Sequence, residues 1–446
     1  MWGYHKNKKR FVRSIDMKPS KHKLTLMARE VLWSGGFTIA GFATSGIFVS
    51  LFFYIASGSI SKMALYSIGQ YLGLMAISVL LVEFARKTSP KTLFRAGIVL
   101  SALFYAILTL LGHRVSGLAF LLGLFNGFAI GIYWFGNNTL AYDVVDPSER
   151  NHFYGLNFAI MSGSNVVMPL LAGELISHIH GSLGFKIVFM LTFVLLGVAF
   201  YSARKLSDTA SMGEVSIVES ILLPLRKKNW MFMSVSLALR SMNQVTQSLG
   251  MIILVVLATH NSGDQGLVAS VVSIATAVAS VAAGKIKPAW RKIGIRTGAV
   301  GVIVATLLLL VSHDLVTVIL FGLLSGLTYP GLFVPLSTVS LEVMDQDENS
   351  ESNRGGYVLS REIAINLGRL AGVGLLLVFL RFARPWPAVF TIMLIGAVSQ
   401  VAVSELIVKV MGSTVEKQDR EKTGTPLPHE SILDTAANVI IRPVGP

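Results

Sequence analysis

The sequence contains no cysteine among its 446 residues. It therefore has no disulfide framework, no thiolate nucleophile and no cysteine-based metal site. Charged residues are also scarce, at 14% of the chain, against roughly 25% in soluble domains. No phosphate-cradling Gly-x-x-x-x-Gly-Lys-Ser/Thr stretch is present, which argues against ATP hydrolysis on this chain. No nucleophile–base pair or metal cluster suggests an enzyme, so we expect neither a cofactor nor a bound metal.

The chain is instead rich in long apolar runs. Hydrophobic residues make up 53% of it, and the mean hydropathy is +0.64. A run of ~20 apolar residues crosses the ~30 Å hydrocarbon core of a bilayer as a helix. The runs of about this length are 31–58, 63–84, 92–111, 118–140, 153–176, 185–201, 230–258, 266–284, 295–312, 315–340, 356–380 and 388–410. The sequence therefore predicts an all-α membrane protein with twelve transmembrane helices. It excludes a soluble nucleic-acid-binding protein despite the net charge of +14.

The distribution of basic residues predicts the topology. Lys and Arg gather in the first 30 residues and in alternate connections, whereas the intervening connections are short and contain few of them. The positive-inside rule then places both termini in the cytoplasm, in what we expect to be a bacterial cytoplasmic membrane. The long connection 202–229 separates two six-helix bundles, 31–201 and 230–410. A basic tail, 1–30, precedes them and a polar tail, 411–446, follows.

Six plus six spans, inward termini and a long central connection resemble the major facilitator superfamily, including its uncharacterised bacterial members. That family carries a Gly-x-x-x-Asp-Arg-x-Gly-Arg-Lys-like stretch after the second span, often repeated after the eighth. The corresponding stretches here, 84–97 and 284–298, keep the basic residues. Arg86 and Lys287 replace the acidic residue, although Glu83 lies close to the first copy. The resemblance implies two bundles that rock about a midplane site, with a gating role for Glu83 and Arg86.

The seventh span carries Arg240, Asn243, Gln244 and Gln247 at spacings that place them on one helical face. Aligned polar groups inside a membrane indicate a water-filled surface that holds a polar or anionic solute. The alternative is a hydrogen-bond ladder between helices, which contributes about 0.6 kcal/mol per pair on average. Four polar groups exceed what packing requires, so we favour the solute-binding interpretation.

The eleventh span carries Glu362, Asn366 and Arg369 on one face, with Arg369 near the middle of the bilayer. A guanidinium there must face protein, water or an anion. One hypothesis is that Arg369 and Asn366 bind solute while Glu362 takes part in proton coupling. The other is that Glu362 or a carbonyl neutralises Arg369 and the polar face only fixes helix packing.

Asn126, deep in the fourth span, is a further candidate ligand. Together these residues predict a secondary transporter of a small anionic or polar solute, embedded in lipid and monomeric, with protons as a candidate coupling ion. Two alternatives remain open at this stage. One is an exporter of hydrophobic drugs. The other is a membrane scaffold or assembly factor that has the fold without transport, because fold alone does not define function.

Overall fold

The computed structural model describes residues 24–84, 88–145, 150–179, 181–206, 216–259, 261–286, 290–347 and 350–423. All the regular structure in these ranges is helical. The elements are α1 (Leu26–Ser57), α2 (Ile60–Phe84), α3 (Pro90–Leu111), η1 (Gly112–Leu118), α4 (Ala119–Val144), α5 (Arg150–His178), α6 (Ser182–Ser202), η2 (Ala203–Lys205), α7 (Ile217–Arg226), α8 (Lys228–Thr259), α9 (Asp264–Gly284), α10 (Arg291–Leu308), α11 (Leu315–Asp345), α12 (Ser350–Phe379) and α13 (Pro385–Thr423).

These runs form helices because a membrane offers no water to the backbone, so its polar groups must bond within the segment. Short polar signals set the helix ends. The side chains of Thr25, Ser89 and Asp314 each accept a hydrogen bond from a backbone N–H in the first turn of the helix that follows. Gly58 ends α1 in a left-handed conformation, at φ 65°.

Within the described residues, eleven helices are long and apolar enough to cross a membrane. The remaining predicted span coincides with α10, which has 18 residues and begins with a basic segment that contains Arg291, Lys292 and Arg296. Its apolar part alone is therefore short for a full crossing. It nevertheless packs against α11 and α13 inside the C-terminal bundle, where the ninth predicted span belongs.

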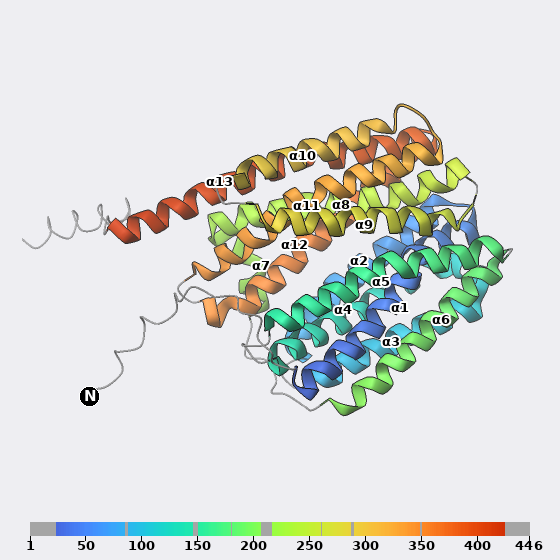
Figure 1. Cartoon of the computed structure of the whole chain (residues 1–446), viewed down its shortest axis with the longest axis horizontal. Coiled ribbons are helices and arrows are strands. Elements are labelled where there is room, and N and C mark those ends of the chain that lie inside the picture. Colours follow the sequence, from blue (N-terminus) through green and yellow to red (C-terminus); the bar gives the residue numbers. More distant parts are fainter. Residues whose placement is uncertain are drawn as a thin grey trace, which may run out of the picture.

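The helices form the two predicted six-helix bundles, which lie side by side in Figure 1. Helices α1–α6 pack on one another, mainly through α2 with α4, α3 with α4 and α1 with α6, and form the N-terminal half. Helices α8–α13 form the C-terminal half. We call the end at which α1 begins and α13 ends, on the left of Figure 1, the tail end, and the opposite end the distal end.

Glycine allows α2 and α4, the helix pair with the most extensive contact, to touch backbone to backbone. A Cβ on Gly123 or Gly127 would collide with the carbonyl oxygen of Tyr66 or Gln70 on α2. Small residues at four-residue spacing bring membrane helices together in this way, because lipid supplies no hydrophobic driving force between them. The N-terminal half is consequently a tightly packed unit.

Three predicted boundaries differ from the structure. The central connection was expected to be a polar loop, but it contains the helix α7, which packs on α8 and α12. Ser216 and Glu219 have the spacing of a capping box at the start of α7, and the Ser216 hydroxyl accepts a hydrogen bond from the Glu219 amide at 3.4 Å. Helix α13 continues to Thr423, so the predicted polar tail begins as helix, and α1 begins at Leu26 within the predicted basic tail.

Candidate functional site

The two halves meet along two helix pairs, α5 with α9 and α2 with α12. At the distal end, α5 and α9 touch through small residues. Gly266 lies so close to α5 that a Cβ there would meet the Pro169 carbonyl and lie 3.0 Å from the Cα of Gly173. Gly263 packs equally closely on Gly173 and Ser177. These small side chains allow backbone contact that closes the space between the halves at this end.

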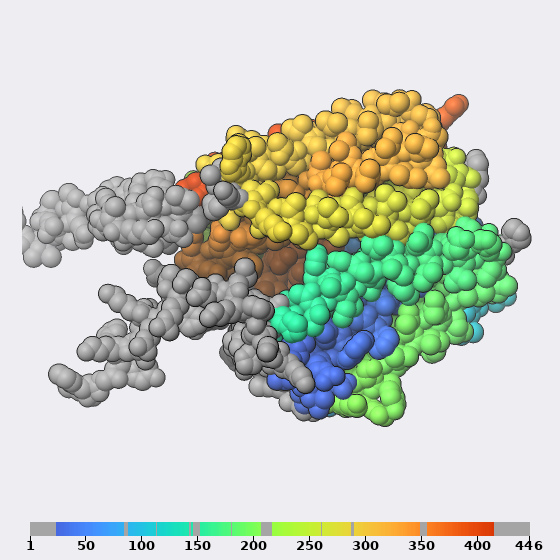
Figure 2. Space-filling view, viewed as in Figure 1, coloured from blue at the N-terminus to red at the C-terminus, as the bar shows by residue number. Residues whose placement is uncertain are grey.

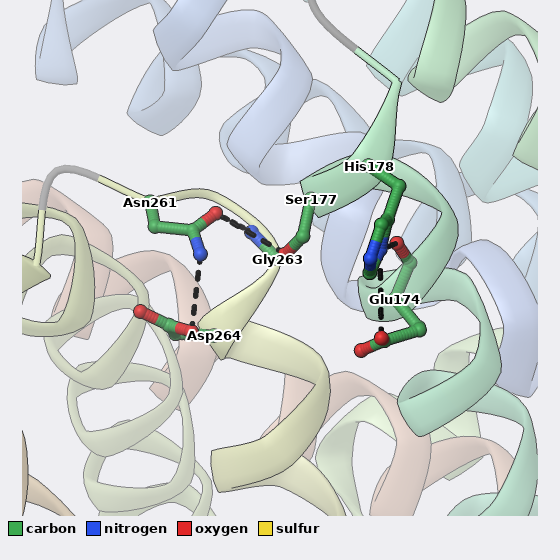
Figure 3. Close-up of polar contacts among 6 residues, drawn as sticks. All are labelled: Glu174, Ser177, His178, Asn261, Gly263 and Asp264. Carbon is green, nitrogen blue, oxygen red and sulfur yellow. Dashed lines mark hydrogen bonds and ion pairs between the residues drawn. The ribbon is translucent and has the colours of Figure 1, made fainter.

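Two hydrogen bonds tie the same helices together. The Ser177 hydroxyl on α5 donates to the side-chain oxygen of Asn261, in the turn before α9, at 3.3 Å (Figure 3). The Ser270 hydroxyl donates to the carbonyl of Val166 at 2.6 Å. The neighbouring Glu174–His178 pair, also drawn in Figure 3, lies on α5 alone and is exposed, so it does not connect the halves. We call these α5–α9 contacts the distal seal.

Toward the tail end, the halves diverge. Figure 2 shows α5 and α9 in contact at the distal end and separated on the left, where α12 is visible behind the gap between them. Several residues along α8, among them Gln244 and Ser248, are exposed although their helix belongs to the centre of its bundle. The structure is therefore closed at the distal end and open at the tail end.

A cavity of about 310 Å³ lies directly beneath the distal seal. Five helices of the two halves line it: α1, α2, α5, α8 and α9. Its polar lining residues are Ser50, Gln70, Tyr71, Asn165, Ser248 and Ser273. Apolar residues such as Phe42, Ile47 and Leu249 complete the wall. Amides and hydroxyls on an otherwise apolar wall can orient a small polar molecule through hydrogen bonds.

Arg369 lies beside this cavity at the junction of α12 and α2. Its guanidinium carbon is 5.4 Å from the ring centre of Tyr71, a residue of the cavity wall. Arg369 donates to the Asn366 side-chain oxygen at 3.3 Å, and the buried Asn366 donates to the Glu362 carbonyl at 2.9 Å. Among the described residues, no carboxylate forms an ion pair with Arg369, so Glu362 does not neutralise it. Most of its donors are left for another acceptor.

Arg240 lies on α8 and contacts α11. Its Nε donates to the Tyr329 hydroxyl at 2.6 Å, and its guanidinium carbon lies 4.4 Å from the ring centre of Phe333. Gln244 and Ser248 follow at four-residue steps and are exposed, so Arg240 begins a polar stripe that leads to the cavity.

Asn243 and Gln247 point away from this stripe, into the C-terminal half. Gln247 donates to the side-chain oxygen of Asn243 at 3.1 Å, to the Thr306 hydroxyl at 3.3 Å and to the Met393 carbonyl at 3.1 Å. The predicted polar face of α8 is thus divided between the opening and contacts with α10 and α13. For Asn243 and Gln247, the contacts match the alternative interpretation of this helix face, a hydrogen-bond ladder between helices, and not solute binding.

Asn126 lies within the N-terminal half and away from the cavity wall. It is 3% exposed and donates to the Tyr66 hydroxyl of α2 at 2.6 Å. Glu83 is exposed near the end of α2, and Arg86 lies outside the described residues. Glu362 is half-buried one turn from Asn366. The structure therefore brings Arg369 to the cavity, connects Arg240 and Gln244 to it, and leaves Asn126 apart.

Sequence reasoning missed most of the cavity wall as a binding surface. Gln70 is a side-chain amide within an otherwise apolar stretch of α2, a pattern that could have marked it as a candidate solute ligand. Ser248 extends the Arg240–Gln244 face by one turn, so continuing that spacing would have found it. Ser273 and Ser50 carry no such signal, because isolated serines are common at helix contacts in membranes.

The arrangement defines a multi-pass membrane protein of transporter fold. The sequence profile of the Major Facilitator Superfamily matches residues 33–257. The chain belongs to this superfamily, as the resemblance in the sequence indicated.

The chain is 24% identical to the uncharacterised protein YqgE of Bacillus subtilis (strain 168) over 346 residues, which are 77% of this chain and 80% of that protein. The fold is similar to the crystal structure of the nucleoside transporter NupG, with a TM-score of 0.64, 11% identity and coverage of 87% and 99% of the two chains. It is also similar to a bacterial homologue of the iron transporter ferroportin in an inward-facing state, with a TM-score of 0.65, 12% identity and coverage of 86% and 98%. At these identities, the structural likenesses concern the fold.

Proposed function

We propose that this protein is a secondary transporter that carries a small polar solute with a negatively charged group across the bacterial cytoplasmic membrane by alternating access. The observation that supports this best is the cavity beneath the distal seal, to which both halves contribute polar side chains. A site built by both halves changes its accessibility when one half rocks against the other. A packing interface within one half has no such property.

The sign of the solute's charge follows from the ionisable groups near the cavity. Arg369 touches the cavity wall through Tyr71, and Arg240 lies on the stripe that leads to it. Within the described residues, no carboxylate lines the cavity. A guanidinium recognises carboxylate and phosphate oxygens through paired donors. A volume of about 310 Å³ fits a small solute, since small-molecule pockets span about 300–1,000 Å³. A metal cation would find fewer suitable ligands here than an anion.

The topology and coupling complete the proposal. The tail end faces the cytoplasm, by the positive-inside rule, so the conformation described here is inward-facing. The protein works as a monomer in contact with membrane lipids. Glu362 is the candidate proton carrier because it lies on the same face of α12 as Arg369. Glu362→Gln should remove the dependence of uptake on a proton gradient while leaving solute binding intact.

Two measurements test the proposed substrate class. First, a thermal-shift screen of the purified protein should find stabilisation by small carboxylates or phosphate esters and none by their neutral analogues. Second, Arg369→Gln should weaken binding of the solute identified by about 10-fold to 150-fold, because it removes a charge-assisted hydrogen bond of about 1.5–3 kcal/mol. Arg381→Gln is the matched control, since Arg381 is an exposed arginine just beyond the distal end of α12.

The alternative functions predict other outcomes. Stabilisation by hydrophobic cations alone, with efflux that persists in Arg369→Gln, would support a drug exporter instead. Absence of any stabilising solute, together with one stable protein partner in crosslinking, would support a scaffold.

A further inference from the structure

A second concave surface lies on the outside of the N-terminal half, at the tail end, between α3 and α6. It has a volume of about 560 Å³ and is lined by Lys91, Thr92, Arg95, Ala96, Val99, Leu100 and Phe200. We call it the α3–α6 groove. The cavity between the halves has none of these residues in its wall, so the groove is a separate site.

The groove changes from basic to apolar along α3. Lys91 and Arg95 lie one turn apart in the first two turns of the helix, at the membrane boundary. Val99 and Leu103 continue the same row toward the middle of the membrane and are 45% and 48% exposed. A phospholipid has the same sequence of properties, with an anionic headgroup at the boundary and an acyl chain below it.

Arg95 is held in place by an aromatic side chain of α6. Its guanidinium carbon lies 4.5 Å from the ring centre of Phe200 on α6, a stacking contact that fixes the group across the groove. The Nε atom is buried and has no hydrogen-bond partner among the described residues. Since the buried Nε is not accessible from the groove, an anion there would meet the guanidinium through its terminal amino groups, which also donate hydrogen bonds.

We propose that the α3–α6 groove binds an anionic phospholipid of the membrane leaflet at the tail end. Lys91 and Arg95 contact the phosphate, and Thr92 adds a hydroxyl donor. The acyl chain lies along Val99 and Leu103. The apolar part of the groove favours a lipid over free phosphate, because an inorganic ion would leave that surface uncovered. The bound lipid would connect α3 to α6 and so stabilise the N-terminal half.

Native mass spectrometry of the full-length protein in detergent tests this proposal. Phosphatidylglycerol is added, with phosphatidylcholine of the same chains and inorganic phosphate as separate arms. The protein should bind phosphatidylglycerol in preference to the other two. Lys91→Gln should weaken this binding about fivefold, and Lys91→Gln with Arg95→Gln about 25-fold, since each cation near an anionic surface contributes about 1 kcal/mol.

The matched control is Lys292→Gln, which removes an exposed cation near the start of α10, in the other half. It should leave binding unchanged. Lys91 forms no hydrogen bond or ion pair with the other described residues, so Lys91→Gln keeps the test valid even where the Arg95 variant fails to fold. Equal weakening by Lys292→Gln, equal binding of phosphatidylcholine, or equal competition by inorganic phosphate would each overturn the proposal.

Discussion

The distal seal gives the sharpest prediction, because one methyl group should shift the balance between its closed and open states. Gly266→Ala places a Cβ against the Pro169 carbonyl and 3.0 Å from the Cα of Gly173. Both neighbours are helix backbone and cannot rotate away. Overpacking of this kind costs about 1–3 kcal/mol. The cost falls on the state in which α5 and α9 touch, so the population open at the distal end should rise about 5-fold to 150-fold.

The absence of cysteine makes this shift measurable with one introduced thiol. Ser248→Cys places the thiol in the cavity wall beneath the seal. In right-side-out vesicles, a membrane-impermeant maleimide reaches this thiol from outside only when the seal is open. The labelling rate should therefore increase at least fivefold when Gly266→Ala is added.

The matched control for this experiment is Gly163→Ala, on α5. A Cβ at Gly163 has no atom within 4 Å, so the same chemical change there creates no collision. Gly163→Ala should keep the labelling rate of the parent from the cytoplasmic side. Gly266→Ala should keep or lower it, because a state open at the distal end is closed at the tail end. Equal outside rates for Gly266→Ala and Gly163→Ala would refute the reasoning about the seal.

Two further predictions concern the two faces of α8 and the helix cap at the start of α11. Asn243→Ala should lower the free energy of unfolding by about 1 kcal/mol without changing solute affinity, because it removes a buried partner of Gln247. Gln244→Ala should instead weaken solute binding about fivefold without changing the free energy of unfolding. If the two variants showed each other's effects, the assignment of the two faces of α8 would be wrong. The pKa of Asp314 is lowered because its carboxylate accepts hydrogen bonds from the Thr317 amide and the Ser312 hydroxyl. This helix cap therefore contributes its full stabilisation above the unfolded pKa of about 3.9. The stabilisation is lost as pH falls through the lower pKa of the folded state. Asp314→Ala should accordingly lower the thermal midpoint at pH 7 and make less difference at about pH 3, and an effect that is the same at both values would contradict this role.

The sequence predicted the helices well because a bilayer permits few alternatives. An apolar run in lipid must be helical, so its length and composition suffice. The exceptions are α7 and the continuation of α13, which lie outside the apolar runs. The capping box at Ser216 and Glu219 was present in the sequence, but hydropathy alone does not detect it.

The candidate site was predicted less completely, because a helix face does not reveal what it faces. Asn243 and Gln244 are adjacent in the chain and fall within one polar arc. Asn243 is nevertheless buried beside Gly396 of α13, whereas Gln244 is exposed. Arg369 was more predictable, since a deep cation excludes lipid contact whatever surrounds it. The cavity wall depends on how two halves meet, which is a property of long-range packing.

The central claim, that both halves must move apart at the distal seal for solute to cross, is tested most directly by locking that seal. Ser177→Cys with Asn261→Cys replaces a 3.3 Å hydrogen bond with a disulfide between α5 and the turn before α9, in a chain that has no other thiol. In proteoliposomes, the oxidised variant should bind the solute found in the thermal-shift screen from the tail end but not transport it, and reduction should restore uptake. Transport at the same rate in the oxidised and reduced forms would contradict alternating access through this seal.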